Sequence, residues 1–447
     1  MPEGGVPGAL PFASVGGAVP TARPAGAGAS AHVRRNFVLN VLDGALFAFA
    51  ISLAARTTVL PLFVQRLGGG NLAVGLLPVL WTFGFSFPQL AVAHRAGRPG
   101  HKKGFVLRTG LVQRLPWLLL AGVTLLWLGE GPAAWALAVF FALYALAAVG
   151  GSLNLPGWFD LVAELTPVRL RGRLFAVRSV FGSLLGVAGG WVVAGVLARS
   201  SGLDGFAVLF GLCFIVMMVS YGFVAALREE PLPETALPGR QPYGAFLRRL
   251  PAILRADRNF RRFLVADALL IAATAADAFY TVHAFERFAL SEAHVGRFVV
   301  VLMAAGAVGS LLFGWLADWI GHRLNLALAA VATLVACAAA VWAPTPEAYL
   351  VAFAGSALAL GLPVISRLPM IAELCGETER PTYIALTNTL TAPFALSGLL
   401  GGWLANAYGY EAVFAGAAAV SLAAALWLVL LVREPRRPAP FHPVHAP

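Results

Sequence analysis

Five ionisable side chains lie inside long apolar stretches of the sequence, where a charge is costly unless it has a partner or a task. They are Asp43, Arg56, Arg114, Asp267 and Asp277. A buried carboxylate can take up and release a proton, and a buried guanidinium can pair with it or bind an anion. These residues are therefore the candidates for proton coupling or for recognition of a polar substrate group.

Asp277 is the expected proton carrier, and Arg56 is its expected partner. Arg56 lies 20 residues after Asn36, and Asp277 lies 18 residues after the similar Asn259, so both should reach a similar depth in equivalent helices. We expect them to pair across the interface between two halves of the protein; the alternative is that each is satisfied within its own half. His283 would either relay protons to Asp277 or lie on the surface at a helix end.

Asp43 and Asp267 occupy equivalent positions, about two helical turns into their stretches. Arg114 should lie at the depth of Asp43, and we expect these two to form a structural pair. Asp43 and Arg56 are 13 residues apart, about 220° around an ideal helix. A straight helix cannot point both at one site, so they serve different partners or the helix is bent; we favour different partners.

No pattern of a known catalytic site is present: the sequence lacks Gly-x-Ser-x-Gly, His-Glu-x-x-His and a phosphate-binding loop. The three cysteines are scattered, without the spacing of a metal site. We therefore expect no enzymatic activity, no cofactor and no metal.

The elements that position these side chains are membrane-spanning helices. Of the 447 residues, 59% are hydrophobic and 12% are charged, half the charged share of soluble domains. Twelve stretches are long enough to cross a bilayer. They cover residues 37–63, 71–93, 104–128, 133–163, 172–198, 205–227, 260–285, 294–319, 324–343, 347–371, 382–407 and 411–432. The predicted fold class is an all-α integral membrane protein with two pseudo-symmetric six-helix bundles.

The stretches divide into two sets of six. We expect a disordered cytoplasmic tail at 1–32, bundles at 33–227 and 260–433, a basic central loop at 228–259 and a tail at 434–447. With both termini cytoplasmic, 23 Lys and Arg fall on the cytoplasmic side and 4 on the other. This bias predicts a multi-pass protein of the cytoplasmic membrane with both termini inside. It also accounts for the net charge of +11 without a nucleic-acid partner.

The two sets resemble each other in sequence. Arg35-Asn36-Phe37 recurs as Arg258-Asn259-Phe260, and Asp43 recurs as Asp267, at offsets of 223 and 224. Gly186 and Gly189-Gly190-Trp191 recur as Gly398 and Gly401-Gly402-Trp403 at an offset of 212. The ordered matches indicate a parallel duplication of a six-helix unit, and the glycines are expected to let helices approach closely.

The chain resembles the major facilitator superfamily of secondary transporters over residues 33–433. That family carries Gly-x-Leu-x-Asp-Arg-x-Gly-Arg-Arg after its second and eighth spans. Here Gly314, Leu316, Asp318, Gly321 and Arg323 match after span eight, while the copy after span two keeps only Arg95, Gly97 and Arg98. Leu90 and His94 replace its glycine and aspartate.

The resemblance implies that this motif is a conformational latch at a cytoplasmic helix end, with Asp318 accepting hydrogen bonds from helix amides or an arginine; the alternative is a simple topological charge. It also implies that spans one, four, seven and ten line a central cavity. Glu164 and Arg171 recur as Glu373 and Arg380. We expect them to form inner-face salt bridges of the latch, or else solvated turns. Asp160 and Glu164 could also reach Arg169 or Arg178.

The predicted function is alternating-access secondary transport. We expect a proton-coupled exporter of lipophilic or amphipathic small molecules, because candidate cavity residues are rich in aromatics and poor in amides. The alternatives are proton-coupled uptake of a small polar or anionic nutrient bound by Arg56 and Arg114, and a membrane receptor or intramembrane enzyme. The expected partners are a small substrate, protons and lipids, and the expected state is a monomer.

Overall fold

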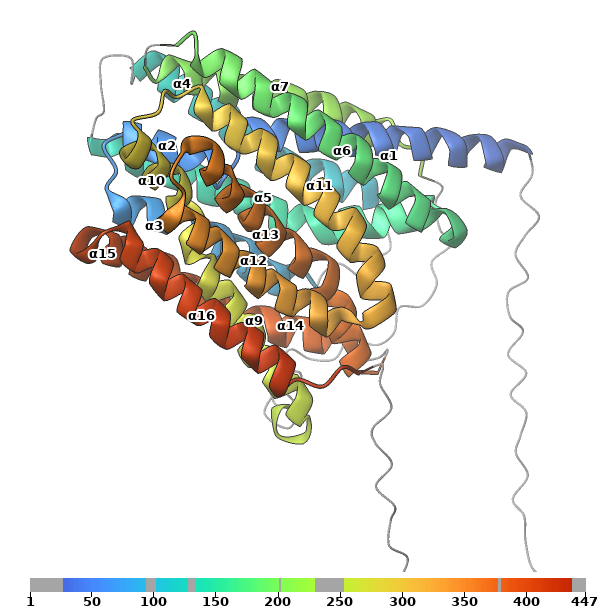
Figure 1. Ribbon diagram of the computed structural model, residues 1–447. Helices are drawn as coiled ribbons and strands as arrows, with labels where there is room; N and C mark the ends of the chain where they lie inside the picture. Colours follow the sequence, from blue (N-terminus) through green and yellow to red (C-terminus); the bar gives the residue numbers. More distant parts are fainter. Residues whose placement is uncertain are drawn as a thin grey trace, which may run out of the picture.

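The computed structural model describes residues 27–93, 102–127, 134–200, 202–229, 253–376 and 379–435. Every regular element within these ranges is a helix (Figure 1). Residues 1–26 of the tail predicted at 1–32, most of the predicted central loop, residues 94–101 and residues 436–447 lie outside the described residues. Residues 27–32, predicted to be disordered, belong to the first helix.

Seven helices lie in the described part of the first half. They are α1 (Ala27–Leu53), α2 (Val59–Arg66), α3 (Asn71–Ala93), α4 (Lys102–Trp127), α5 (Ala134–Leu165), α6 (Val168–Leu197) and α7 (Asp204–Ala225). Here α1 and α2 together form the first span.

The second half repeats this order with two further interruptions. Its elements are α9 (Arg258–Ala273), η1 (Thr274–Ala278), α10 (Phe279–Phe288), α11 (His294–Ile320), α12 (His322–Trp342), α13 (Pro346–Leu374), α14 (Arg380–Thr391), η2 (Ala392–Leu396), α15 (Ser397–Tyr408) and α16 (Tyr410–Leu430). The seventh span consists of α9, η1 and α10, and the eleventh of α14, η2 and α15.

The described residues bear out the twelve-span, all-helical prediction. Eleven of the described segments are apolar helices of membrane-spanning length, and a shorter apolar helix, Asn71–Ser86, supplies the second span. The first span differs from its predicted bounds, because α1 begins at Ala27 and the helix is interrupted between Leu53 and Val59.

Pro61 explains this interruption. Proline has no backbone N–H, so it cannot donate to the carbonyl four residues earlier, which belongs to Thr57. That carbonyl instead accepts a hydrogen bond from the Thr281 hydroxyl of the other half at 3.0 Å. The break therefore provides a polar contact between the halves.

The two ends of the bundle differ in how the halves meet. We call the end where α1 and α9 begin the terminal face, and the end that carries α2 and α10 the far face. In Figure 1 the terminal face lies toward the right and the bottom, and the far face toward the upper left. One continuous core cluster near the far face includes Leu60, Leu77, Tyr280 and Val299, and so joins both halves. Near the terminal face, separate clusters belong to the first half and to the second. The halves are thus closed together at the far face.

Glycines permit this closure, as the sequence predicted. A Cβ on Gly398 would overlap the backbone of Gly75 on α3, and one on Gly190 of α6 would lie 2.7 Å from Val300 N on α11. Gly186 lies against Met303 of α11 in the same way. Since these pairs join α3 to α15 and α6 to α11, equivalent helices of the two halves make equivalent close contacts.

An ion pair also joins the halves at the far face. Arg66 Nη2 lies 2.5 Å from Glu292 Oε1. Burial raises the pKa of Glu292 above its ordinary value, with Arg66 opposing the shift and Asp204 adding to it.

The raised pKa predicts a pH dependence of closure. Because the closed form binds this proton more tightly than a form in which Glu292 is hydrated, lowering the pH toward the raised pKa should favour closure at the far face. Distances between spin labels placed at Gly70 and Tyr408 should shorten on average as the pH is lowered into the range where Glu292 takes up its proton. Glu292→Gln should weaken this dependence, and an equally strong dependence in that variant would contradict the assignment.

Candidate functional site

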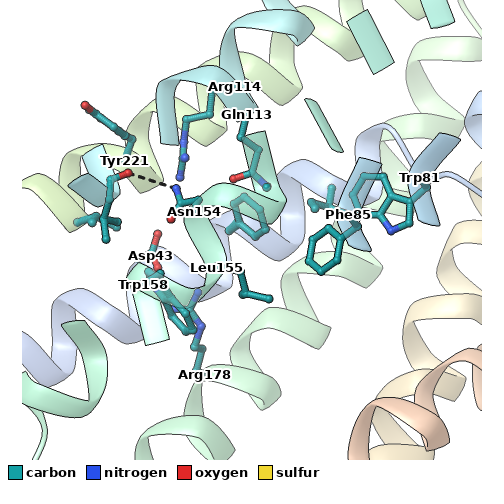
Figure 2. Close-up of a pocket in the computed structure, with 15 residues that line it drawn as sticks. Asp43, Trp81, Phe85, Gln113, Arg114, Asn154, Leu155, Trp158, Arg178 and Tyr221 are labelled. Atoms are coloured by element: carbon teal, nitrogen blue, oxygen red, sulfur yellow. Dashed lines mark hydrogen bonds and ion pairs between the residues drawn. The ribbon is translucent and has the colours of Figure 1, made fainter. Parts of the chain in front are cut away.

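A cavity of about 220 Å³ lies among the helices of the first half. Its described lining comes from α1, α3, α4, α5, α6 and α7, which differs from the expected lining by spans one, four, seven and ten. Asp43, Arg114 and Arg178 supply the charges, and Gln113 and Asn154 supply amides. Phe47, Trp81, Phe85, Trp158 and Tyr221 form much of the wall (Figure 2).

Asp43 is neutralised by a different arginine from the one predicted. Arg178 Nη1 on α6 lies 2.7 Å from Asp43 Oδ2, and Ser220 Oγ donates to Asp43 Oδ1 at 2.6 Å. Arg178 also donates to the Asn40 carbonyl and stacks over Trp158, 4.5 Å from the ring centroid. The predicted pair of Asp43 with Arg114 is therefore wrong, because Arg178 crosses α1 at the level of Asp43.

Gly44 makes room for this crossing. A Cβ at Gly44 would overlap the Arg178 side chain. We predict that Gly44→Ala displaces Arg178 and leaves Asp43 buried without its cation, lowering the free energy of unfolding by about 3 kcal/mol. Thermal unfolding in detergent checks this, with Gly122→Ala as the control because no atom lies within 4 Å of a Cβ there. Equal stability of the two variants would contradict the prediction.

Arg114 lines the same cavity and forms no direct ion pair among the described residues, although Asp43 is close enough to interact with it electrostatically. It is only 4% exposed, and it donates from Nε to the Met217 carbonyl and from Nη1 to the Gly110 carbonyl, at 3.0 and 2.9 Å. Its guanidinium lies over the rings of Phe47 and Tyr221, 5.7 and 5.3 Å from their centroids. Its positive charge is thus held by carbonyls and aromatic faces.

Asp267 has a counterpart arrangement in the second half. Arg367 Nη2 on α13 lies 2.8 Å from Asp267 Oδ2 and also donates to Thr391. The repeat thus gives each half one buried aspartate–arginine pair, although the arginines come from non-equivalent spans.

Asp277 is the buried carboxylate of the candidate set that lacks an ion pair within the described part of the chain. It lies in η1, is 6% exposed and accepts a hydrogen bond from Ser356 Oγ at 2.5 Å. The 3₁₀ turn interrupts the seventh span at this level and brings Asp277 toward α13.

Arg56 lies in the break of the first span, where its side chain is exposed. Its guanidinium is 5.1 Å from the ring centroid of Trp81 and is close enough to interact electrostatically with Asp277 and Tyr144. Among the described residues it forms no direct ion pair with Asp277. The predicted pairing is therefore wrong for this state. The hydrogen bond from Thr281 to the Thr57 carbonyl nevertheless brings the segments that carry Asp277 and Arg56 together across the halves. As predicted, Asp43 and Arg56 do not point at one site. They have different partners, and the helix is also broken between them.

His283 is not a surface residue. It is 9% exposed, and its Nδ1 lies 3.0 Å from the Tyr349 hydroxyl, which donates to the Tyr280 carbonyl. Since its hydrogen-bond partner is Tyr349 rather than Asp277, the structure gives no direct relay between them.

In the first of the two helix-end loops, Glu164 and Arg171 pair differently from the prediction. Glu164 forms an ion pair with Lys102 at 3.1 Å, and Glu373 lies 3.7 Å from His322 Nε2. Arg171 instead donates to the carbonyls of Thr166 and Ala163 at the end of α5. These contacts join the fourth span to the third and the tenth to the ninth, so the repeat holds. In the first half Lys102 replaces Arg171 as the partner of Glu164. Arg380 starts α14, and its predicted role stays a prediction.

The structure describes part of the predicted latch, at Gly314, Gly321 and Arg323. Gly321 has φ of +96°, which favours glycine, and a Cβ there would overlap Glu434. The backbone N–H of Arg323 donates to Glu434 at 3.0 Å, and its side chain donates to the Val432 carbonyl. Gly314 has open space around it, so the close approach expected there is absent. The Asp318 side chain and Arg95, Gly97 and Arg98 lie outside the described residues, and their roles stay predictions.

A repeated set of hydrogen bonds at the terminal face was not predicted from the sequence. Asn36 exchanges two hydrogen bonds with the backbone of Arg228, and Asn259 does the same with Arg433. The next residues, Glu229 and Glu434, accept from backbone N–H groups at the starts of α4 and α12. The matching Arg-Glu pairs 205 residues apart were the available signal.

The fold and the buried charges define a class. Two similar six-span halves, closed together at one face, with polar residues held at mid-depth, form the architecture of a multi-pass membrane transporter. Among the described residues, no group of three or more His, Cys, Asp and Glu is placed to hold a metal ion.

The family follows from comparison with known proteins. The sequence matches the Major Facilitator Superfamily over residues 45–392 and 269–446. The chain belongs to this superfamily and is a secondary transporter. No curated protein matches the chain at a significant level.

Solved structures share the fold at low sequence identity. A point mutant of the nucleoside transporter NupG has a TM-score of 0.69 at 14% identity, covering 90% of this chain and 100% of its own. A bacterial homologue of the iron transporter ferroportin in an inward-facing state has a TM-score of 0.64 at 16% identity, covering 89% and 98%. A D-xylose–proton symporter has a TM-score of 0.63 at 15% identity, covering 91% and 99%. These likenesses concern the fold alone.

Proposed function

We propose that this secondary transporter is a proton-coupled exporter of amphipathic small molecules that works by alternating access in the cytoplasmic membrane. The observation that carries this proposal is the environment of the Asp277 carboxylate. Asp43 and Asp267 each have an arginine, whereas the carboxylate of Asp277 is buried with a hydroxyl partner in a broken span. A carboxylate without a fixed cation can be loaded and unloaded with a proton, which is the task of a coupling site.

The location of Asp277 supports coupling to conformational change. It lies one helical turn before Thr281, which bonds the first half through the Thr57 carbonyl. A change of charge at Asp277 therefore acts next to a contact that must break when the far face opens. With both termini cytoplasmic, as the distribution of Lys and Arg favours, the described state is closed to the outside.

The cavity lining supports an amphipathic substrate. Aromatic walls give apolar contact, and Gln113, Asn154 and Arg114 give a few polar groups. This combination suits a compound with an apolar body and a small polar end. Uptake of a small anionic nutrient is the second candidate, and it is favoured by the buried guanidinium of Arg114.

Transport into proteoliposomes of known orientation tests the proposal. Under an imposed pH gradient, an exporter should move an amphipathic substrate from the cytoplasmic to the outer side while protons move the opposite way. Movement of substrate and protons in the same direction would favour uptake, and transport indifferent to the gradient would reject proton coupling.

A further inference from the structure

We propose that the cavity of the first half selects amphipathic anions, with Arg114 binding the negative group and the aromatic wall holding a flat apolar ring. This inference rests on the proposed function in taking the cavity as the substrate site. It narrows the substrate from amphipathic compounds in general to those with a carboxylate or a similar anion attached to a small ring system.

The charge balance of the cavity carries the inference. The described lining contains two arginines and one aspartate. Arg178 and Asp43 neutralise each other at 2.7 Å, and Ser220 occupies the second carboxylate oxygen. What remains is the positive charge of Arg114, in a wall made mainly of aromatic and aliphatic side chains. A ligand anion would supply the missing countercharge.

The geometry of Arg114 leaves part of its guanidinium available. Nε and Nη1 donate to the Met217 and Gly110 carbonyls, and within the described chain Nη2 has no protein acceptor. These two bonds hold the group without neutralising it. Because a guanidinium presents its donors in a plane, a carboxylate can approach the remaining edge in a fixed orientation.

Neighbouring amides add neutral donors for the same anion. Figure 2 shows Gln113 and Asn154 beside Arg114, on the opposite side of Asp43 from Trp158 and Arg178. The Asn154 amide already donates to the Val106 carbonyl at 3.3 Å. Gln113 lies against α5 next to Gly151, where a Cβ would come within 3.0 Å of its Nε2.

The rest of the cavity fits a ring. Trp81 and Phe85 are stacked, with centroids 5.9 Å apart and planes at 16°, and both line the cavity with Phe47 and Ile51. The volume of about 220 Å³ is below the range for drug-sized ligands, so the expected ligand has one or two fused rings.

Three matched probes test the charge preference. They are 2-naphthoate, 2-naphthalenemethanol and (2-naphthylmethyl)trimethylammonium, which share a ring and differ in charge. Binding to the full chain in detergent is followed by calorimetry and by quenching of tryptophan fluorescence. We expect 2-naphthoate to bind at least about tenfold more tightly than the other two, as a charge-assisted hydrogen bond predicts. Equal binding of all three, tighter binding of the ammonium probe, or no saturable binding of naphthoate would overturn the inference.

Two variants locate the effect. Arg114→Gln should weaken naphthoate binding at least about tenfold while leaving the alcohol unchanged, and Arg297→Gln, an exposed arginine on α11, should leave both unchanged. Because Arg114 also bonds two carbonyls, Leu155→Glu is the second variant: it keeps Arg114 and places a carboxylate in the cavity wall. That variant should lose the preference for the anion. Unchanged naphthoate binding in both cavity variants would reject the assignment.

The outcome is separable from that of the proposed coupling mechanism. Asp277→Asn leaves the cavity lining intact and should bind naphthoate as the wild type does. Loss of coupling with retained anion preference would support both proposals. Retained coupling with retained preference would reject only the role of Asp277, and loss of preference in the wild type would reject only the substrate class.

Discussion

Asp277→Asn is expected to abolish substrate-driven proton flux in proteoliposomes. The substitution keeps the shape of the side chain and its contact with Ser356, but the amide cannot exchange a proton in the physiological range. If Asp277 carries the coupled proton, substrate binding and the fold should survive while proton movement falls to the level of protein-free liposomes.

The measurement needs a control carboxylate that is exposed at the end of a helix. Glu347, exposed at the start of α13, provides it, and Glu347→Gln should transport as the wild type does. An internal pH-sensitive dye records the flux, and thermal unfolding confirms that both variants are folded. Undiminished substrate-dependent proton flux in Asp277→Asn would show that another group carries the proton.

Gly296→Ala is expected to disfavour closure at the far face and to slow transport strongly. A Cβ there would overlap Ala194 and the Gly190 carbonyl on α6. Because backbone atoms cannot rotate away, the helices must separate, and overpacking of this kind costs about 1–3 kcal/mol. The ratio of closed to open molecules should fall by about 5- to 150-fold.

The same helix offers a control for Gly296→Ala. Gly306 on α11 has no atom within 4 Å of a Cβ position, so Gly306→Ala makes the same change in helix propensity without the clash. Distances between labels at Gly70 and Tyr408 should lengthen in Gly296→Ala and stay unchanged in Gly306→Ala. Equal distances in the two variants would show that α6 and α11 accommodate the extra methyl group.

The architecture could be predicted from sequence because it depends on long-range composition. Twelve apolar stretches, the repeated Arg-Asn-Phe segments and the paired glycines each extend over many residues, so no single error changes the result. The break between Leu53 and Val59 was harder to predict from the sequence, although Pro61 was the signal for it. The break at Thr274–Ala278 lacks a proline, and its sequence gives little warning of a 3₁₀ turn.

The partners of the buried charges could not be predicted in the same way. Depth along a helix follows from residue number, but the choice between Arg114 and Arg178 for Asp43 depends on which side chain has room to cross α1. Gly44 decides it, and its effect appears only once α6 is placed beside α1. Likewise, Glu164 meets Lys102 because the third and fourth spans end side by side, which spacing within one loop does not reveal.

The proline break has a consequence for water. While the halves are closed, the Thr57 carbonyl that Pro61 leaves unpaired is satisfied by Thr281. When the far face opens, that oxygen must be hydrated, because an unsatisfied carbonyl in the membrane interior is costly. Exchanging a protein donor for a water donor is nearly neutral in free energy. The break therefore makes hydration of the first span at this depth part of every opening event, at little cost to the balance between the two states.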